Sequence, residues 1–324
     1  MTAKLVVALP LDEGQRADLE RGLDELKLPL KCVYVQQGEL AAEHLEGAVA
    51  LLGNPAPQLV AGSALELLQL GTAGFNGYES RGVLPEGLTV CNAVGAFGLS
   101  VGEHMLALTF ALLRHLHLYR DEQLRGSWRS RGNVISLRGS TVLVLGMGDI
   151  GSYYARSVKA LGAARVLGVR EHADRALPEG FDAQYPLSAL DTLLPQADIV
   201  AMVLPGNEQT CGLINARTLA LCKRGALLIN VGRGSAIVES TLIEALESGQ
   251  LGAAAVDVCA QEPLPKSSPL WRCERLLITP HVAGNYFLRE TLNLIVRLLL
   301  SNLRAFYAGE GLRNVVLQGE QKKG

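Results

Sequence analysis

Short apolar runs rich in β-branched residues alternate with helix-like stretches along almost the whole chain. Buried strands separated by helices are typical of parallel sheets that carry helices on both faces. The pattern therefore predicts an α/β protein with doubly wound parallel sheets. The runs expected to form strands lie near Leu5, Cys32, Val49 and Leu88, and then over residues 141–146, 165–169, 198–204, 226–231, 254–258 and 275–279.

A longer helical pattern begins at Val101 and marks the expected boundary between two domains. Its apolar positions recur at roughly helical spacing, which is typical of a stripe that packs on a core. These positions are Met105, Leu108, Leu112 and Leu116. We expect residues 103–287 to form a dinucleotide-binding domain. Residues 1–102 and 288–324 then form a discontinuous substrate-binding domain, which the chain re-enters through a closing helix.

The composition narrows the class of protein. Hydrophobic residues make up 48% of the 324 residues and charged residues 19%, which is typical of globular domains. A formal charge of -2 leaves no basic surplus for a nucleic-acid backbone, so we expect a small-molecule partner and no nucleic acid. The N-terminal segment lacks the apolar core of a signal peptide, and Arg114 and Arg297 interrupt the most apolar stretches. We therefore expect no membrane span.

The six cysteines are scattered and form no CxxC pair. This usage favours reduced thiols and a cytoplasmic location over a disulfide framework or a zinc site. His115 and His117 are two residues apart, which is not the spacing that places two ligands on one helix face. No metal site is expected. The cysteines are Cys32, Cys91, Cys211, Cys222, Cys259 and Cys273.

A glycine-rich fingerprint follows the predicted strand at 141–146 and precedes a helix-like run. Gly146, Gly148 and Gly151 form GxGxxG, with Asp149 and Ile150 before the third glycine. In this context the first glycine permits a tight turn, the second lets backbone amides approach a pyrophosphate, and the third lets helix and strand pack closely. We expect these five residues to bind a nicotinamide dinucleotide.

The residue after the next predicted strand indicates whether NAD or NADP is bound. An acidic side chain usually holds the ribose hydroxyls of NAD there, but this chain has Arg170, followed by Glu171 and, further on, Arg175. A guanidinium suits a 2′-phosphate. The sequence favours NADP over NAD. In the alternative, Arg170 is an exposed charge and Glu171 still reaches the ribose.

The later strands each end in polar or special residues. Pro205, Arg233, Asp257 and His281 all lie at or just after such ends. The carboxyl ends of the strands line the ligand crevice of a doubly wound sheet. We therefore expect Arg233, Asp257 and His281 to face the nicotinamide end of this crevice.

The sequence segments around these residues resemble the D-2-hydroxyacid dehydrogenase family. LINVGRGSAIVE, DVCAQEPLP and ITPHVAGN look like its arginine, glutamate and histidine signatures, and order and spacing agree from about Leu67 to Asn285. LGTAGFN resembles its substrate-carboxylate loop, and CNAVGAFGLSVGEH resembles the segment entering its interdomain helix. Val203 and Val238 depart from the family pattern, which often has His or Asn at the first position and an acidic residue at the second.

The resemblance implies a Rossmann-type cofactor domain and a discontinuous flavodoxin-like substrate domain. It implies that Arg233 binds the substrate carboxylate and polarises the 2-oxo group, and that His281, paired with Glu262, is the acid/base. Backbone N–H groups of Ala73 and Gly74 would hold the carboxylate from the other domain. Asp257 would bind the nicotinamide carboxamide. Further cofactor contacts are implied at Leu204, Pro205, Thr210, Val231, Gly232, Arg233 and His281.

The chemistry asks for the same residue types. Hydride delivery to a carbonyl leaves an alkoxide that needs a proton, and histidine is the side chain that titrates nearest neutral pH. A carboxylate beside a histidine favours the imidazolium, the form that donates. Arginine offers a planar carboxylate a fixed fork of donors, which lysine lacks.

The expected function is hydride transfer between NAD(P)H and a small 2-oxo or D-2-hydroxy acid. The same resemblance includes an alternative from another class, a corepressor-like protein that senses NAD(H), and a lesser one, formate or phosphite oxidation. Glyoxylate, hydroxypyruvate, pyruvate and bulkier acids stay open as substrates, with Phe97, Trp271, Tyr286 and the loop at 53–57 as residues that could shape the pocket. The resemblance also implies a homodimer, for which the apolar run 101–118 offers a surface unless it is buried within one chain.

Overall fold

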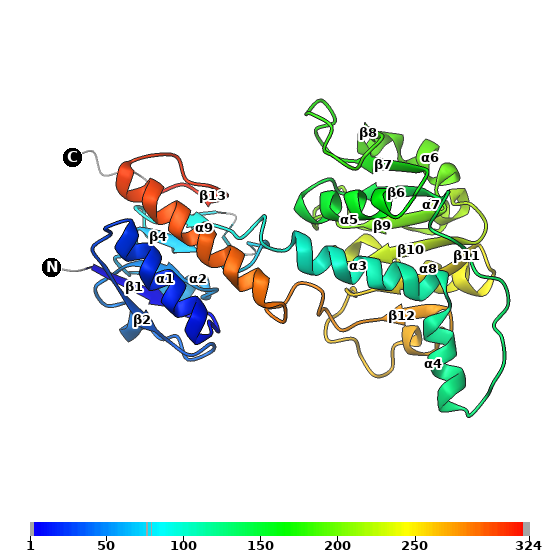
Figure 1. Ribbon diagram of the computed structural model, residues 1–324, viewed down its shortest axis with the longest axis horizontal. Coiled ribbons are helices and arrows are strands. Elements are labelled where there is room, and N and C mark those ends of the chain that lie inside the picture. The colour runs from blue at the N-terminus through cyan, green and yellow to red at the C-terminus, as the bar shows by residue number, and fades with distance from the viewer. Residues whose placement is uncertain (1–2, 76, 79, 320–324) are drawn as a thin grey trace. The chain divides into compact units, whose positions relative to one another are not determined.

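The computed structural model divides into two compact units (Figure 1). Unit 1 comprises Met1–Phe97 and Tyr286–Gly324, and unit 2 comprises Gly98–Asn285. The structure describes residues 3–75, 77–78 and 80–319. The chain leaves unit 1 and returns to it a few residues earlier than the boundaries expected from the sequence.

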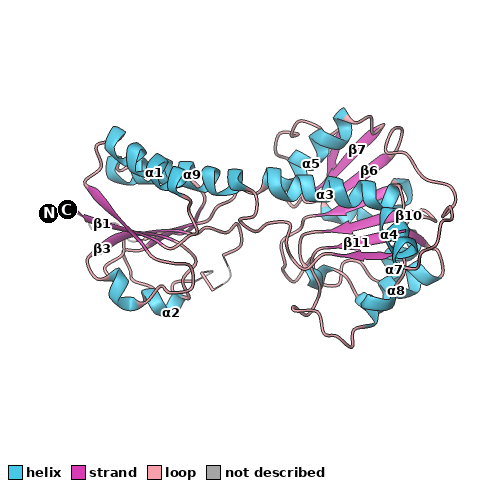
Figure 2. Ribbon diagram, turned by 60° about the horizontal axis from the view of Figure 1, so that its bottom comes forward, coloured by secondary structure: helices cyan, strands magenta, loops and turns pink. Residues whose placement is uncertain are grey.

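Unit 1 is built on a sheet in the order β13-β5-β4-β3-β1-β2. The strands β1 to β5 pair in parallel, and β13 runs antiparallel to β5 at the edge. Figure 2 shows α1 and α9 on one face of this sheet and α2 on the other. The elements are β1 (Ala3–Val7), α1 (Glu13–Glu25), β2 (Leu30–Tyr34), β3 (Ala48–Leu52), α2 (Pro57–Val60), β4 (Leu67–Gln69), β5 (Thr89–Cys91), α9 (Arg289–Ala308) and β13 (Val315–Leu317).

Helices from opposite ends of the chain close unit 1. The buried Gln15 of α1 donates through Nε2 to the carbonyl of Arg289, at 3.1 Å, and to Oδ1 of Asn293, at 2.9 Å. On α9, Asn302 donates to Oε1 of Gln69 at 2.8 Å, and both side chains are fully buried. Because these polar groups satisfy one another inside the core, they fix where α9 packs.

Unit 2 is built on a wholly parallel sheet in the order β12-β11-β10-β9-β6-β7-β8. The order in which strands are added reverses between β6 and β9, so the crevice for a ligand lies at the carboxyl ends of these two strands. Figure 2 shows α3 and α5 on one face and α7 and α8 on the other. The strands are β6 (Thr141–Leu145), β7 (Arg165–Val169), β8 (Ala183–Tyr185), β9 (Ile199–Met202), β10 (Ala226–Asn230), β11 (Leu251–Val256) and β12 (Leu276–Ile278). The helices are α3 (Gly98–Leu113), α4 (Leu116–Leu124), α5 (Asp149–Ala160), α6 (Leu190–Leu193), α7 (Ala216–Leu221) and α8 (Glu239–Glu247).

The expected long helix is in fact two helices. The apolar stripe of α3 is buried as predicted, but α3 starts at Gly98 and ends at Leu113. His115 has a φ of 57°, in the left-handed region, and α4 begins after it. The spacing of apolar residues does not reveal a helix break at a single left-handed residue. The prediction of one continuous helix over 101–118 was therefore wrong.

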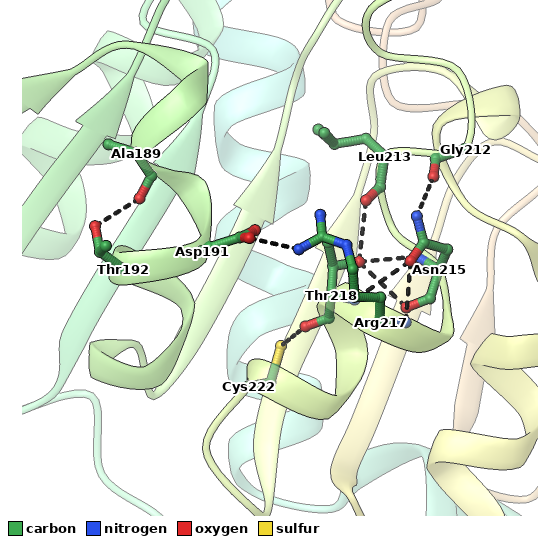
Figure 3. A network of polar contacts seen from close by, with 9 residues as sticks. All are labelled: Ala189, Asp191, Thr192, Gly212, Leu213, Asn215, Arg217, Thr218 and Cys222. Carbon is green, nitrogen blue, oxygen red and sulfur yellow. Dashed lines mark hydrogen bonds and ion pairs between the residues drawn. The ribbon is translucent and has the colours of Figure 1, made fainter.

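The connection from β9 to β10 is held by the polar contacts shown in Figure 3. Asn215 caps α7, because its side chain accepts from the N–H groups of Arg217 and Thr218 and donates to the carbonyl of Gly212. Arg217 also forms an ion pair with Asp191. The cap satisfies the first N–H groups of a short helix and so fixes the chain that leads to β10.

Among the helices formed by the described residues, none is both long and apolar enough to cross a lipid bilayer. All six cysteines are free thiols.

Candidate active site

The glycine fingerprint forms the turn from β6 into α5. Gly146 has a φ of +106°, which L side chains rarely adopt, and its N–H donates to the carbonyl of Val169 at 2.9 Å. A Cβ on Gly151 would lie 1.9 Å from the carbonyl oxygen of Gly146, so only glycine allows α5 to start this close to the strand. Two glycines of the fingerprint are therefore needed by the fold itself.

Gly148 differs from these two glycines. A Cβ placed on it would meet no atom within 4 Å, and its backbone is extended, with φ -77° and ψ -161°. It is the N-cap of α5, whose first residues are Asp149 and Ile150. The open space before a helix N-terminus, where N–H groups are unpaired, is what a pyrophosphate requires. The residues present therefore fit a dinucleotide.

Arg170 stands beside this turn. Val169 is paired with Leu145 in the parallel ladder, so Arg170 and Gly146 follow neighbouring strand ends. The N–H of Arg170 donates to the carbonyl of Tyr185 at 3.0 Å, and its guanidinium makes no hydrogen bond or ion pair with the other described residues. Glu171 and Arg175, which follow it, are exposed.

The loop after β9 places Leu204, Pro205 and Thr210 near the same sheet edge. Leu204 is buried, whereas Pro205 is exposed. The buried hydroxyl of Thr210 donates to the carbonyl of Pro205 at 2.7 Å and accepts from the N–H of Asn207 at 2.9 Å. Thr210 therefore closes this loop, and any cofactor contact of Pro205 depends on it.

Arg233 lies on a loop whose backbone is fixed from two sides. The fully buried Asn230 accepts from the N–H of Gly232 at 3.0 Å and donates to the carbonyl of Arg233 at 2.9 Å. A Cβ on Gly234 would lie 1.9 Å from the carbonyl carbon of Cys259. The arginine loop thus packs directly against the turn that carries Glu262. Val231, just after β10, is buried below the loop.

His281 and Glu262 form a pair, with 2.6 Å between Nδ1 and Oε2. The other oxygen of Glu262 accepts from the N–H of Cys259 at 2.9 Å, which aims the carboxylate. The His281 side chain remains 53% exposed. Because Nδ1 is engaged, Nε2 is the nitrogen left to exchange a proton with a substrate.

Asp257 holds the turn on which His281 lies. Its buried carboxylate accepts from the N–H groups of Val282 and Ala283, at 3.0 and 3.1 Å, and from the hydroxyl of Thr279, at 2.5 Å. Its carbonyl accepts from the N–H of His281 at 2.8 Å, and His281 has a φ of 53°. The sequence pointed to Asp257 only as a cofactor ligand and missed this structural function.

In unit 1, the loop containing Ala73 and Gly74 is held by its carbonyls. Asn92 donates to the carbonyl of Ala73 at 2.9 Å, and Thr72 donates to that of Gly74 at 2.8 Å. The N–H groups of Ala73 and Gly74 donate to no other described residue. Two unpaired N–H groups on a fixed loop suit a carboxylate. Asn76, the last residue of the motif, lies outside the described residues.

A second pair of side chains supports this loop. Tyr286 donates to the carbonyl of Gly71 at 2.9 Å and accepts from Asn54 at 2.8 Å, while Asn54 also accepts from the N–H of Gly71. Burial raises the pKa of the Tyr286 hydroxyl, so it stays a donor. The sequence had marked Tyr286 and the loop at 53–57 only as possible pocket walls.

Comparison with known proteins decides the family. Residues 106–283 match the model of the D-isomer specific 2-hydroxyacid dehydrogenase, NAD binding domain. The chain belongs to the D-isomer specific 2-hydroxyacid dehydrogenase family. It is therefore an oxidoreductase that uses NAD(P), and an NAD(H)-sensing corepressor is not favoured.

Individual relatives of this dehydrogenase cover nearly all of the chain. A glycerate dehydrogenase of Methylorubrum extorquens is 31% identical over 293 residues, which are 86% of this chain and 88% of the relative. The crystal structure of a family member from Aeromonas salmonicida subsp. salmonicida matches with a TM-score of 0.83 and 33% identity, over 99% of this chain and 100% of the other. A D-isomer specific 2-hydroxyacid dehydrogenase from Xanthobacter autotrophicus, solved in complex with NADPH and MES, matches with a TM-score of 0.79 and 28% identity, over 97% and 98%. The two-domain fold expected from the sequence is confirmed.

Proposed function

We propose that this dehydrogenase reduces a small 2-oxo acid to the D-2-hydroxy acid, with His281 as the proton donor. The observation that carries the proposal is the 2.6 Å pair between His281 Nδ1 and Glu262 Oε2, on an imidazole that is half exposed. A histidine held by a carboxylate is oriented for general acid catalysis and is favoured in its charged form. NAD(P)H, when bound, supplies the hydride. His281 Nε2 then supplies the proton to the oxygen of the reduced carbonyl.

Arg233 is proposed to bind the substrate carboxylate and to polarise the 2-oxo group. Its support is the rigid loop between Asn230 and the Cys259 turn, which limits where the guanidinium can lie. The N–H groups of Ala73 and Gly74, which donate to no other described residue, are proposed as further donors to a substrate carboxylate. Charge-assisted hydrogen bonds of both kinds are among the stronger polar contacts in proteins.

The cofactor is proposed to be NADPH in preference to NADH. Support comes from the unengaged Arg170 beside the glycine turn and from the NADPH bound to the Xanthobacter relative. We expect Arg170→Asp to reverse or flatten the preference measured as kcat/KM with each cofactor, with Arg175→Asp as the weaker comparison. A wild-type enzyme that clearly favours NADH would contradict this assignment.

Gly146, Gly148, Asp149, Ile150 and Gly151 are proposed to bind the pyrophosphate end of the cofactor. Leu204, Pro205, Thr210, Val231 and Gly232 are proposed to line its path, and Asp257 to reach the carboxamide. For Thr210 and Asp257 this function comes in addition to the loop contacts described above.

The substrate is proposed to be a short 2-oxo acid such as hydroxypyruvate or glyoxylate, in line with the glycerate dehydrogenase relative. The test is oxidation of NADPH and NADH, followed at 340 nm across glyoxylate, hydroxypyruvate, pyruvate and a branched 2-oxo acid. We expect turnover with a short acid and its loss in His281→Ala. Cofactor binding without turnover on any acid would contradict the enzyme and favour a regulator.

The protein is further proposed to be a cytoplasmic homodimer. Free thiols support the location. The dimer surface expected from the sequence was the apolar stripe of α3, but this stripe is buried inside unit 2. We therefore propose that the dimer forms through exposed apolar side chains that follow α3 in the sequence: Leu116, Leu124, Trp128, Val134 and Ile135. Trp128 is fully exposed, which is rare for tryptophan in a monomer. Sedimentation should give a dimer, and Trp128→Glu should weaken it. A monomeric wild type at micromolar concentration would contradict pairing.

A further inference from the structure

A histidine that the sequence did not mark as catalytic contacts the residues that hold the His281 turn. His104 lies on α3, and its Nε2 is 3.0 Å from Oγ1 of Thr279 and 3.6 Å from Oδ1 of Asp257. The His104 side chain is 23% exposed, and that of Asp257 is 1% exposed. All three residues belong to unit 2.

The direction of these hydrogen bonds follows from counting protons. The Thr279 hydroxyl carries one proton, and it is donated to Asp257 at 2.5 Å. The oxygen of Thr279 can then only accept from His104, so Nε2 of His104 must carry a proton. The chain of donors runs from His104 to Thr279 to Asp257, and Asp257 in turn holds the N–H groups of Val282 and Ala283.

We propose that His104 is a positioning residue for the reaction, acting through Thr279 and Asp257 on the turn that carries His281. This inference rests on the proposed acid function of His281. His281 is the residue of this turn in a left-handed conformation, with φ 53°, and such a conformation persists only where surrounding contacts hold it. Three donors fix the Asp257 carboxylate, and His104 fixes the hydroxyl that is one of them.

The contact also ties the catalytic turn to a long helix. α3 packs on α5 and across β10 and β11, and its buried stripe includes Met105, the residue next to His104. A side chain on so well packed a helix has little freedom to move. His104 therefore links the His281 turn to a helix packed in the core of unit 2, and not to another loop.

Two substitutions at His104 distinguish the effect of its hydrogen-bond donor from the effect of its imidazole ring. In His104→Gln the amide nitrogen takes the place of Nε2 and keeps a donor, whereas His104→Leu removes it. We expect His104→Leu to lower kcat about ten- to hundredfold, as for a catalytic group displaced by about 1 Å, with a smaller change in the KM of the 2-oxo acid. His104→Gln should retain most of kcat. Glu103→Gln, an exposed neighbour on α3, is the matched control and should match the wild type.

A double-mutant cycle tests the route. Thr279→Val removes the hydroxyl, and Thr279→Ser keeps it. If His104 acts through Thr279, His104→Leu should have little further effect on kcat in the Thr279→Val background but its full effect in Thr279→Ser. Additive losses in the Thr279→Val background would overturn the proposal, as would a wild-type kcat in His104→Leu.

Amide hydrogen exchange gives a readout independent of turnover. Val282 and Ala283 donate to Asp257, so their N–H groups should exchange faster in His104→Leu and at the wild-type rate in His104→Gln. If the wild type reduces no 2-oxo acid, the proposed function fails, while this measurement still decides whether His104 orders the turn. Unchanged exchange in His104→Leu would overturn the inference.

Discussion

Replacing Gly148 with alanine should separate cofactor binding from folding. The added methyl group meets no protein atom within 4 Å, and the backbone of Gly148 is already in a conformation that alanine adopts freely. Alanine restricts the unfolded chain more than glycine does, which adds about 0.4–1 kcal/mol, but it is a poorer N-cap than glycine by a similar amount. The free energy of unfolding should therefore change by less than about 1 kcal/mol.

The same methyl group would lie at the N-terminus of α5, in the space assigned to the pyrophosphate. A phosphate oxygen bound to a helix N–H at about 2.9 Å loses that hydrogen bond when it moves out by about 1 Å. A hydrogen bond to a charged group contributes about 1.5–3 kcal/mol, so the Kd of NADPH should rise roughly ten- to hundredfold.

Gly151→Ala is the matched comparison, because its Cβ would lie 1.9 Å from the Gly146 carbonyl oxygen. Overpacking of this kind costs about 1–3 kcal/mol, so this variant should lose stability as well as binding. The assay is thermal unfolding with and without NADPH at about a hundred times the wild-type Kd, where binding adds about 2.7 kcal/mol to the wild type. In Gly148→Ala the gain should fall to about 1.4 kcal/mol or less. A full NADPH-induced shift in Gly148→Ala would refute the assignment of the pyrophosphate to this turn.

Three further predictions concern single side chains. His281→Ala should lower kcat by about a hundred- to ten-thousandfold, and Glu262→Gln should lower it by less, since the carboxylate only orients the ring. Steady-state rates with one accepted 2-oxo acid check this prediction. Near-normal turnover of His281→Ala would contradict the assignment of His281 as the acid. Arg233→Lys should raise the KM of the acid and lower kcat, because lysine lacks the planar fork, and unchanged kinetics would argue against a bidentate contact. Hydrogen bonds from the Ser127 and Arg129 side chains hold the pKa of Glu122 at about 2, below its ordinary value of 4.5. The stability this gives is complete above pH 4.5 and is lost as the pH falls toward 2, so the Tm difference between the wild type and Glu122→Gln should shrink over that range, and a constant difference would contradict the linkage.

The strands with a strong apolar signal were predictable from the sequence, and those without it were not. The runs at 141–146 and 226–231 became β6 and β10, because their residues are buried on both faces of the sheet. β4 was missed, since LELLQL has the composition of a helix, and its Gln69 is polar although fully buried. Tertiary pairing between β3 and β5 makes it a strand. The antiparallel β13 was also missed, because it is only three residues long and its place in the sheet depends on pairing with β5.

Motifs in the sequence indicated the proposed catalytic residues, but not the residues that hold them in place. Glu262 and His281 lie 19 positions apart in the sequence and are paired in the structure. His104 is 175 positions from Thr279, and Asn54 is 232 positions from Tyr286. Neither separation leaves a local pattern, because such contacts depend on how α3 and the returning chain pack. Sequence motifs therefore indicate candidate substrate-binding groups more readily than the side chains that position those groups.

The two-part construction of unit 1 sets an order for folding during synthesis. Residues 3–97 are made before unit 2, yet their sheet still lacks α9 and the edge strand β13, which come after unit 2. At about 5–20 residues per second, the ribosome needs on the order of 10–40 s to make the roughly 190 residues in between. Unit 2, which is continuous, can fold as soon as its own residues are available. The face of the unit 1 sheet that α9 covers therefore stays incompletely covered until residues 289–317 have been made.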